Sequence, residues 1–131
     1  MLIAEVSEKF DINSTTLRYY EKIGLMDPVE KDASGHRNYQ EKDLRRINFI
    51  KCMRTAGMSI ENIKKYVDLF HEGEDTISAR KELLVQQHTE LKAQMVELQK
   101  AIDYLETKIA NYEEKIVKKE LDMRQQNKDF I

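Results

Sequence analysis

The chain has 131 residues, a formal net charge of −2, 40% hydrophobic residues and 35% charged residues. This length allows one small domain with an appendage, and the composition is typical of a helical protein with a long exposed helix. The sequence contains no signal peptide and no apolar run of 18 residues, so we expect a cytoplasmic protein that does not span a membrane. The single cysteine, Cys52, excludes an internal disulfide framework.

Charge is distributed unevenly along the chain. Residues 1–70 carry 12 Lys and Arg against 11 Asp and Glu, a net charge of +1 (12 − 11), and residues 71–131 carry 10 against 13, a net charge of −3 (10 − 13). A surface that binds an anion must therefore be a local patch, because the chain as a whole has no positive field.

The first 23 residues predict two short helices joined by a tight turn. Apolar residues at helical spacing indicate a helix over residues 3–10, and Asn13 is typical of the N-cap of a second helix over residues 14–23. This arrangement is a helix-turn-helix pattern. Leu17 and Tyr20 share the inward face of the second helix. The outward face carries hydroxyl, guanidinium, phenol and amine groups, which suit phosphates and base edges, from Thr15, Arg18, Tyr19 and Lys22.

Residues 28–39 predict a small hairpin, which we call the wing. Pro28 opens the segment and Ser34-Gly35 is a turn signal. We expect two strands of about three residues each, with His36, Arg37 and Tyr39 at or near the tip.

Two further helices are expected, over residues 41–56 and 60–70, the second capped by Ser59. The inward residues predicted for them are Leu44, Ile47 and Ile50 in the first and Ile63, Val67 and Phe70 in the second.

A long helix is expected from Thr76 to Lys118, because no Gly or Pro follows Gly73. Its seam positions alternate in steps of four and three, a heptad repeat, and are Leu84, His88, Leu91, Met95, Leu98, Ile102, Leu105, Ile109, Tyr112 and Ile116. A helix cannot bury such a stripe on itself, so we expect it to pair with a second copy of the chain. The pattern leaves the direction of pairing open. His88, the polar seam residue, is expected to set the register or to lie at a frayed end of the pairing. A proton switch is the less favoured alternative. Residues 119–131 carry little pattern.

The run Thr16-Leu17-Arg18-Tyr19-Tyr20-Glu21-Lys22-Ile23-Gly24-Leu25, preceded by Ile3-Ala4-Glu5-Val6, resembles the opening of the MerR family of bacterial transcription regulators. The similarity continues through Arg37-Asn38-Tyr39 and Ala56-Gly57-Met58-Ser59-Ile60 and ends in the long helix.

The resemblance implies a mainly α fold: a winged helix-turn-helix DNA-binding domain (residues 1–72), an antiparallel coiled-coil dimerisation helix (73–118) and a C-terminal tail (119–131). It also implies a homodimer on a promoter with a long spacer, bound through an inverted-repeat operator. Distortion of that spacer lets RNA polymerase engage, which is recognition by DNA deformation.

The resemblance also implies the DNA contacts. Major-groove contacts are expected from Thr15, Thr16, Arg18 and Tyr19, with Ser14 and Lys22 beside them. Contacts to phosphates or groove edges are expected from Tyr20, His36, Arg37 and Tyr39. An inward-facing Tyr20 is equally consistent with a core tyrosine.

Family members that sense metals carry paired cysteines after the dimerisation helix, and drug-sensing members carry an added domain. The sequence shows neither, so we expect no metal and no cofactor. Cys52 is similar to the single cysteine of a small subfamily linked to aldehyde, nitric oxide or other electrophile stress. Lys51 and Arg54 favour a thiolate, whereas a place near the C-terminal end of a helix disfavours one. A buried structural cysteine is the alternative.

Two other functions remain open from the residues: a DNA-architectural winged-helix factor, and a coiled-coil adaptor that binds only protein. The long seam argues against the first. An enzyme is not expected, because the sequence has no phosphate-binding Gly loop, nucleophile–base pair or metal-ligand cluster.

Overall fold

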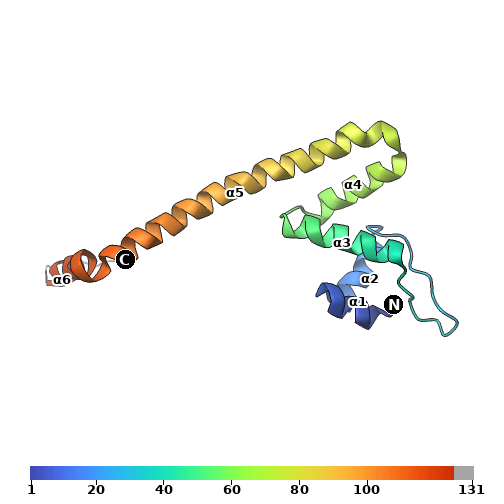
Figure 1. Ribbon diagram of the computed structural model, residues 1–131, viewed down its shortest axis with the longest axis horizontal. Coiled ribbons are helices and arrows are strands. Elements are labelled where there is room, and N and C mark those ends of the chain that lie inside the picture. The colour runs from blue at the N-terminus through green and yellow to red at the C-terminus, as the bar shows by residue number, and fades with distance from the viewer. Residues whose placement is uncertain (126–131) are drawn as a thin grey trace. The chain divides into compact units, whose positions relative to one another are not determined.

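The computed structural model describes residues 1–125. The chain divides into two compact units, Met1–Leu91 and Lys92–Ile131. The first contains α1 (Ile3–Phe10), α2 (Ser14–Lys22), α3 (Glu41–Thr55), α4 (Ile60–Glu72), a 3₁₀ turn (Glu74–Thr76) and the beginning of α5 (Ile77–Asn111) (Figure 1). The second contains the remainder of α5, a π-helical turn (Tyr112–Ile116) and α6 (Val117–Gln125).

The expected helix-turn-helix is confirmed. Asp11 ends α1 in the left-handed conformation with φ of 54°, and the Ser7 hydroxyl donates to the Ile12 carbonyl at 2.6 Å. Asn13 then caps α2, because its Oδ1 accepts from the Thr15 amide at 2.7 Å. Two short helices are thereby held at a fixed turn, and each buries one apolar face.

The wing forms without the two strands expected. Residues 31 and 37 make an isolated antiparallel bridge, and the Asp32 carboxylate accepts from the amides of Ser34 and His36 at 2.9 and 3.0 Å. Backbone hydrogen bonds of 2.8 Å flank this bridge, from the Asp32 amide to the His36 carbonyl and from the Asn38 amide to the Glu30 carbonyl. The Tyr39 amide then donates to the Met1 carbonyl instead of continuing the pairing, so no ladder develops. Gly35 completes the turn with φ of 82°.

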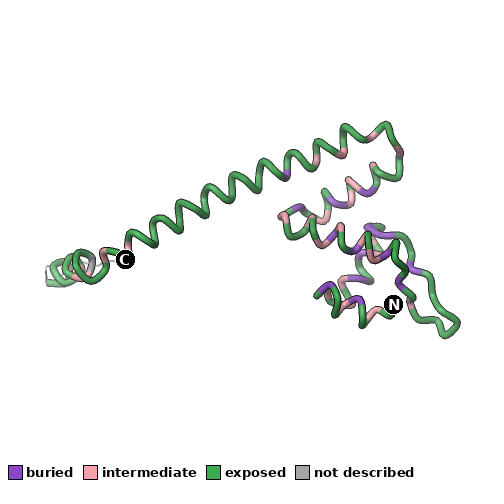
Figure 2. The backbone as a smooth tube through the Cα atoms, viewed as in Figure 1, coloured by how far each residue is buried: buried purple, intermediate pink, exposed green. Residues whose placement is uncertain are grey.

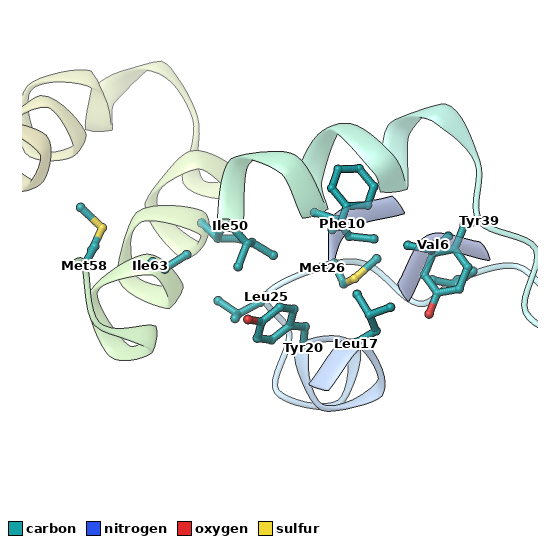
Figure 3. Packing of buried hydrophobic residues seen from close by; sticks show 13 residues of the cluster. Val6, Phe10, Leu17, Tyr20, Leu25, Met26, Tyr39, Ile50, Met58 and Ile63 are labelled. Carbon is teal, nitrogen blue, oxygen red and sulfur yellow. The ribbon is translucent and has the colours of Figure 1, made fainter. Parts of the chain in front are cut away.

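A single apolar cluster holds the helices of the first unit together. α3 contacts both α1 and α4 (Figure 1), and Figure 3 shows Tyr20, Leu25 and Ile50 grouped within the cluster. The buried apolar residues are Val6, Phe10, Leu17, Tyr20, Leu25, Met26, Val29, Tyr39, Ile47, Ile50, Met58, Ile63 and Val67. The expected inward position of Phe70 is wrong. Its side chain is 52% exposed at the end of α4, where the Arg80 guanidinium lies 5.4 Å from its ring centroid.

The seam of α5 is apolar and exposed in the single chain. Exposed fractions of its apolar residues up to Tyr112 range from 36% at Leu84 to 73% at Ile109, and most of α5 carries the exposed colour in Figure 2. His88 is exposed as well, and the side chain of Ile116 lies outside the described residues. A continuous apolar stripe left in water indicates a surface for a partner helix.

The expectation of an unbroken helix to Lys118 is wrong. The α-helix ends at Asn111, whose backbone (φ −104°, ψ 2°) departs from helical values and whose side-chain amide donates to the Thr107 carbonyl at 3.0 Å. Asparagine competes in this way for backbone groups and weakens helix interiors. Residues 119–125 are helical although their sequence carries little pattern, since α6 continues to Gln125. Within residues 1–125 no helix combines the length and apolarity that a membrane crossing requires.

Candidate nucleic-acid interface

The outward face of α2 presents four polar side chains at helical spacing. Thr15, Arg18, Tyr19 and Lys22 are all exposed, whereas Leu17 and Tyr20 anchor the opposite face in the core with 0% and 6% exposed. Ser14 and Thr16 are partly exposed. The buried face fixes which way α2 points, so the polar face is presented as one surface of donors and acceptors.

An ion pair ties the wing to α2. The Arg37 Nε donates to Glu21 Oε1 at 3.0 Å, and its Nη2 lies 3.5 Å from Oε2. The two side chains are 28% and 17% exposed, which reduces screening by water. The hydrogen bond to Glu21 raises the pKa of the Arg37 guanidinium, so this group stays charged. Arg37 therefore positions the wing as well as contributing a positive charge.

His36 lies at the exposed tip of the wing. Its Nδ1 is 3.9 Å from the Asp32 carboxylate, with the histidine side chain 71% exposed. The imidazole is therefore accessible to a partner.

Tyr20 and Tyr39 lie in the core, away from the exposed face. Burial raises the pKa of the Tyr20 hydroxyl, with the Arg54 charge acting in the opposite direction. Burial also raises the pKa of Tyr39, helped by Glu21 and opposed by Arg37 and Arg18. Within the described residues the buried Tyr39 hydroxyl has no hydrogen-bond partner. Both tyrosines were expected to contact phosphates or groove edges. Their burial instead indicates that they pack in the core.

The structure brings three of the predicted residues to one hollow of about 260 Å³. Arg18 comes from α2, and His36 and Arg37 come from the wing. The remaining lining residues are Leu2, Ile3, Ala4 and Gly35. The sequence did not predict that the beginning of α1 lines this surface, because Leu2, Ile3 and Ala4 are apolar and carry no signal for anions. At this end of α1 the Leu2 amide already donates to the Glu5 carboxylate at 2.9 Å, so the positive character of the hollow comes from the side chains of Arg18 and Arg37.

Cys52 is exposed on α3. The alternative prediction, a buried structural cysteine, is therefore wrong. It borders an open hollow of about 470 Å³ together with Lys9, Phe10, Asn48, Lys51 and Thr55. The two cations expected to favour a thiolate have other partners: the Lys51 ammonium donates to the Phe10 carbonyl and the Arg54 Nη1 donates to the Met58 carbonyl at 2.8 Å. Among residues 1–125 no group of three or more metal-ligating side chains is found.

Two family models match the chain. The "MerR HTH family regulatory protein" model matches residues 1–69 and the "MerR, DNA binding" model matches residues 44–108. The chain belongs to the MerR family. It is thus a helix-turn-helix transcriptional regulator, and its α5 stands where the family has its dimerisation helix.

Relatives and solved structures agree with this assignment. The MerR-family chain is 48% identical over 91 residues to the HTH-type transcriptional regulator AdhR of Bacillus subtilis, a match that covers 70% of this chain and 65% of AdhR. It is 37% identical over 110 residues to an uncharacterized HTH-type regulator of Haemophilus influenzae, covering 84% and 82%.

A putative MerR family regulator from Listeria monocytogenes has a similar structure, with 42% identity, a TM-score of 0.78 and coverage of 97% and 96%. HiNmlR, described as a MerR family regulator lacking the sensor domain and bound to promoter DNA, has 37% identity, a TM-score of 0.74 and coverage of 85% and 88%.

Proposed function

We propose that two copies of this chain bind an inverted-repeat operator in promoter DNA, each placing the exposed face of α2 in the major groove. The observation that carries this proposal is the division of α2 into a buried apolar face and an exposed face bearing Thr15, Arg18 and Tyr19. A guanidinium held on a rigid helix suits the two acceptors on the guanine edge, and hydroxyls suit either base edges or phosphates. Ser14, Thr16 and Lys22 flank this face and contribute to the same contact.

In this proposal the wing contacts the backbone beside the groove. His36 and Arg37 reach phosphates, and the hollow that they line with Arg18 accepts one of them. Contacts of this kind fix the register of a protein on DNA without reading the sequence. Tyr20 and Tyr39 support the interface indirectly, by holding α2 and the wing in place from the core.

The homodimer forms through the apolar seam of α5, from Leu84 onward. Residues 1–72 read DNA, residues 73–118 pair the two copies antiparallel, and residues 119–131 form the tail. Pairing through a rigid helix separates the two reading surfaces by a fixed distance. A fixed separation allows contacts at two half-sites to offset the cost of deforming a long promoter spacer, so that RNA polymerase can engage.

The test has two steps. DNA is first selected from a random duplex pool with the full chain, and the affinity of the recovered duplex is then measured by fluorescence anisotropy. Arg18→Ala should weaken binding by about 1–3 kcal/mol per site, while Lys9→Ala, which removes an exposed cation on α1, should change it little. An Arg18→Ala protein that binds the selected duplex as tightly as the wild type would overturn the proposal.

We further propose that Cys52 senses reactive electrophiles. The exposure of its thiol to small molecules supports this proposal. Alkylation or oxidation at this site adds a group to the hollow between α1 and α3 and alters how α3 packs on Phe10. Promoter response to formaldehyde, methylglyoxal or nitric oxide should be lost in both Cys52→Ala and Cys52→Ser. A response that persists in these variants rules the thiol out as the sensor.

A further inference from the structure

The beginning of α5 is fastened to the DNA-binding part of the chain at two places, both within the unit Met1–Leu91. The first is the corner between α4 and α5. There the Thr76 hydroxyl lies 2.7 Å from both the Leu69 and Gly73 carbonyls, and the Arg80 Nε donates to the same hydroxyl at 3.1 Å. The Arg80 guanidinium also lies over the rings of Tyr66 and Phe70, 6.0 and 5.4 Å from their centroids.

The second fastening is a hydrogen bond from Gln87. Its Nε2 donates to the Ala56 carbonyl at 2.8 Å, and the side chain is buried, with 9% exposed. Ala56 is the C-cap of α3, so Gln87 satisfies one of the carbonyls that a helix leaves without an internal partner. The other buried polar side chain among the described residues, Asp43, serves its own helix by accepting from the Gln40 amide.

The turn at Gly57, which follows Ala56, leaves room for the Gln87 side chain. A Cβ at Gly57 would lie 3.2 Å from the Gln87 Nε2, and the backbone there has φ of 87°, so glycine both fits the turn and leaves room for the amide. The Arg54 Nη1 donates to the Met58 carbonyl at 2.8 Å and holds the same turn from the other side. Met58 itself is buried, with 1% exposed, which anchors the turn in the core.

Thr76 and Gln87 are eleven residues apart, so the two fastenings are separated by about 16 Å along α5 at 1.5 Å per residue. A rod held at one end can pivot, whereas a rod held at two separated points has a fixed direction. Most other side chains of residues 77–91 are exposed, so the direction of this stretch depends on the two fastenings.

We propose that Gln87 is a positioning residue for DNA recognition: its hydrogen bond to Ala56 fixes the direction in which α5 leaves the DNA-binding domain, and thereby the half-site spacing that the dimer prefers. The proposal rests on the proposed DNA-binding homodimer. In this proposal Gln87 acts through the direction of α5 relative to α2 and the wing, and not through a contact of its own with DNA.

The first test needs no DNA. Spin labels are placed at Lys65→Cys on α4 and Glu90→Cys on α5, both exposed sites, in a Cys52→Ser background. Labelled chains are diluted into a large excess of unlabelled chains, and the distance distribution is measured by pulsed electron paramagnetic resonance. Gln87→Leu keeps the bulk but removes the donor, and it should broaden or shift the distribution. Gln86→Leu, the same change at an exposed neighbour, should leave it unchanged. Coincident Gln87→Leu and wild-type distributions would overturn the proposal.

The second test measures spacing. The duplex selected with the wild type is compared with versions whose half-sites are moved one base pair closer or farther apart. Gln87→Leu should reduce the preference for the native spacing by about threefold to tenfold, the range that loss of one buried hydrogen bond allows. A purely structural role would lower the melting temperature and weaken binding to all three duplexes equally, and that outcome would also overturn the proposal. If the wild type selects no duplex, the proposed function fails, while the distance measurement still decides whether Gln87 sets the direction of α5.

Discussion

The Arg37 guanidinium and the Glu21 carboxylate, sixteen residues apart in the chain, form an ion pair with Nε and Oε1 separated by 3.0 Å. This pair joins the wing to α2, the helix proposed to enter the major groove. An acidic residue beside a DNA-binding surface would ordinarily weaken affinity through repulsion of phosphates. Because Glu21 holds Arg37 in place, we expect the orientation of the wing to outweigh that cost.

Glu21→Ala therefore distinguishes orientation from net charge. We expect operator affinity to fall by about twofold to fivefold, the effect of losing a charged hydrogen bond that is partly exposed. If net charge alone mattered, removing a negative group would raise affinity. Fluorescence anisotropy with the selected duplex provides the measurement, and Glu8→Ala, which removes an exposed carboxylate on α1, controls for charge. Tighter binding by Glu21→Ala than by Glu8→Ala would contradict the positioning role.

The second prediction concerns the buried Tyr39 hydroxyl, whose removal should not weaken the protein. Because it has no partner within the described residues, folding leaves it desolvated without a compensating hydrogen bond. Tyr39→Phe should keep the ring packing and leave the free energy of unfolding unchanged or raise it by up to about 1 kcal/mol. Urea denaturation followed by circular dichroism gives this quantity. A loss of stability above about 1 kcal/mol would show that the hydroxyl has a partner, and a loss of operator affinity at unchanged stability would restore the direct DNA contact first expected for Tyr39.

The two buried tyrosines predict how stability changes at alkaline pH. Burial raises the pKa of both Tyr20 and Tyr39 above the ordinary value of 10.0, so above pH 10 the unfolded chain ionises these groups while the folded chain keeps them protonated. The folded state then binds more protons, and stability falls as pH rises. Their contribution is fully present below about pH 9 and is lost from about pH 10 upward. Thermal melts from pH 8 to 11 should show a shallower alkaline decline in Tyr20→Phe and Tyr39→Phe than in the wild type. Parallel curves for the three proteins would contradict the assignment.

Helical elements were predictable from the sequence because their apolar residues recur every three to four positions. The bounds expected for the first four helices agree with α1 to α4 to within two residues, and Asn13 and Ser59 act as the caps expected of them. Apolar spacing and helix caps depend only on residues that are close together in the chain, so they can be recognised in the sequence itself.

Contacts between distant residues were not predictable. The sequence predicted a DNA contact for Arg37 and no role for Glu21, so nothing in it paired the two. Gln87 follows Gln86 on a polar stretch with nothing to mark it as buried. The turn of the wing is closed by the Asp32 carboxylate, which accepts from two amides of the turn, and α5 ends at Asn111, whose side chain bonds the Thr107 carbonyl. Both are competitions between side chain and backbone that apolar periodicity does not register.

The last prediction concerns the exposed seam of α5, since the proposed homodimer depends on it. Leu98 lies near the middle of the seam and is 65% exposed in the single chain. In a dimer each copy buries its own leucine, so Leu98→Lys removes two such contributions, about 1.5–3 kcal/mol each, and adds two like charges at the contact. We expect this variant to sediment as a monomer at micromolar concentration, with the helical content of its DNA-binding domain retained and its operator affinity largely lost. Gln99→Lys adds the same charge one residue away from the seam and should remain dimeric. Normal promoter recognition by a protein that sedimentation shows to be monomeric would mean that two linked reading surfaces are not required.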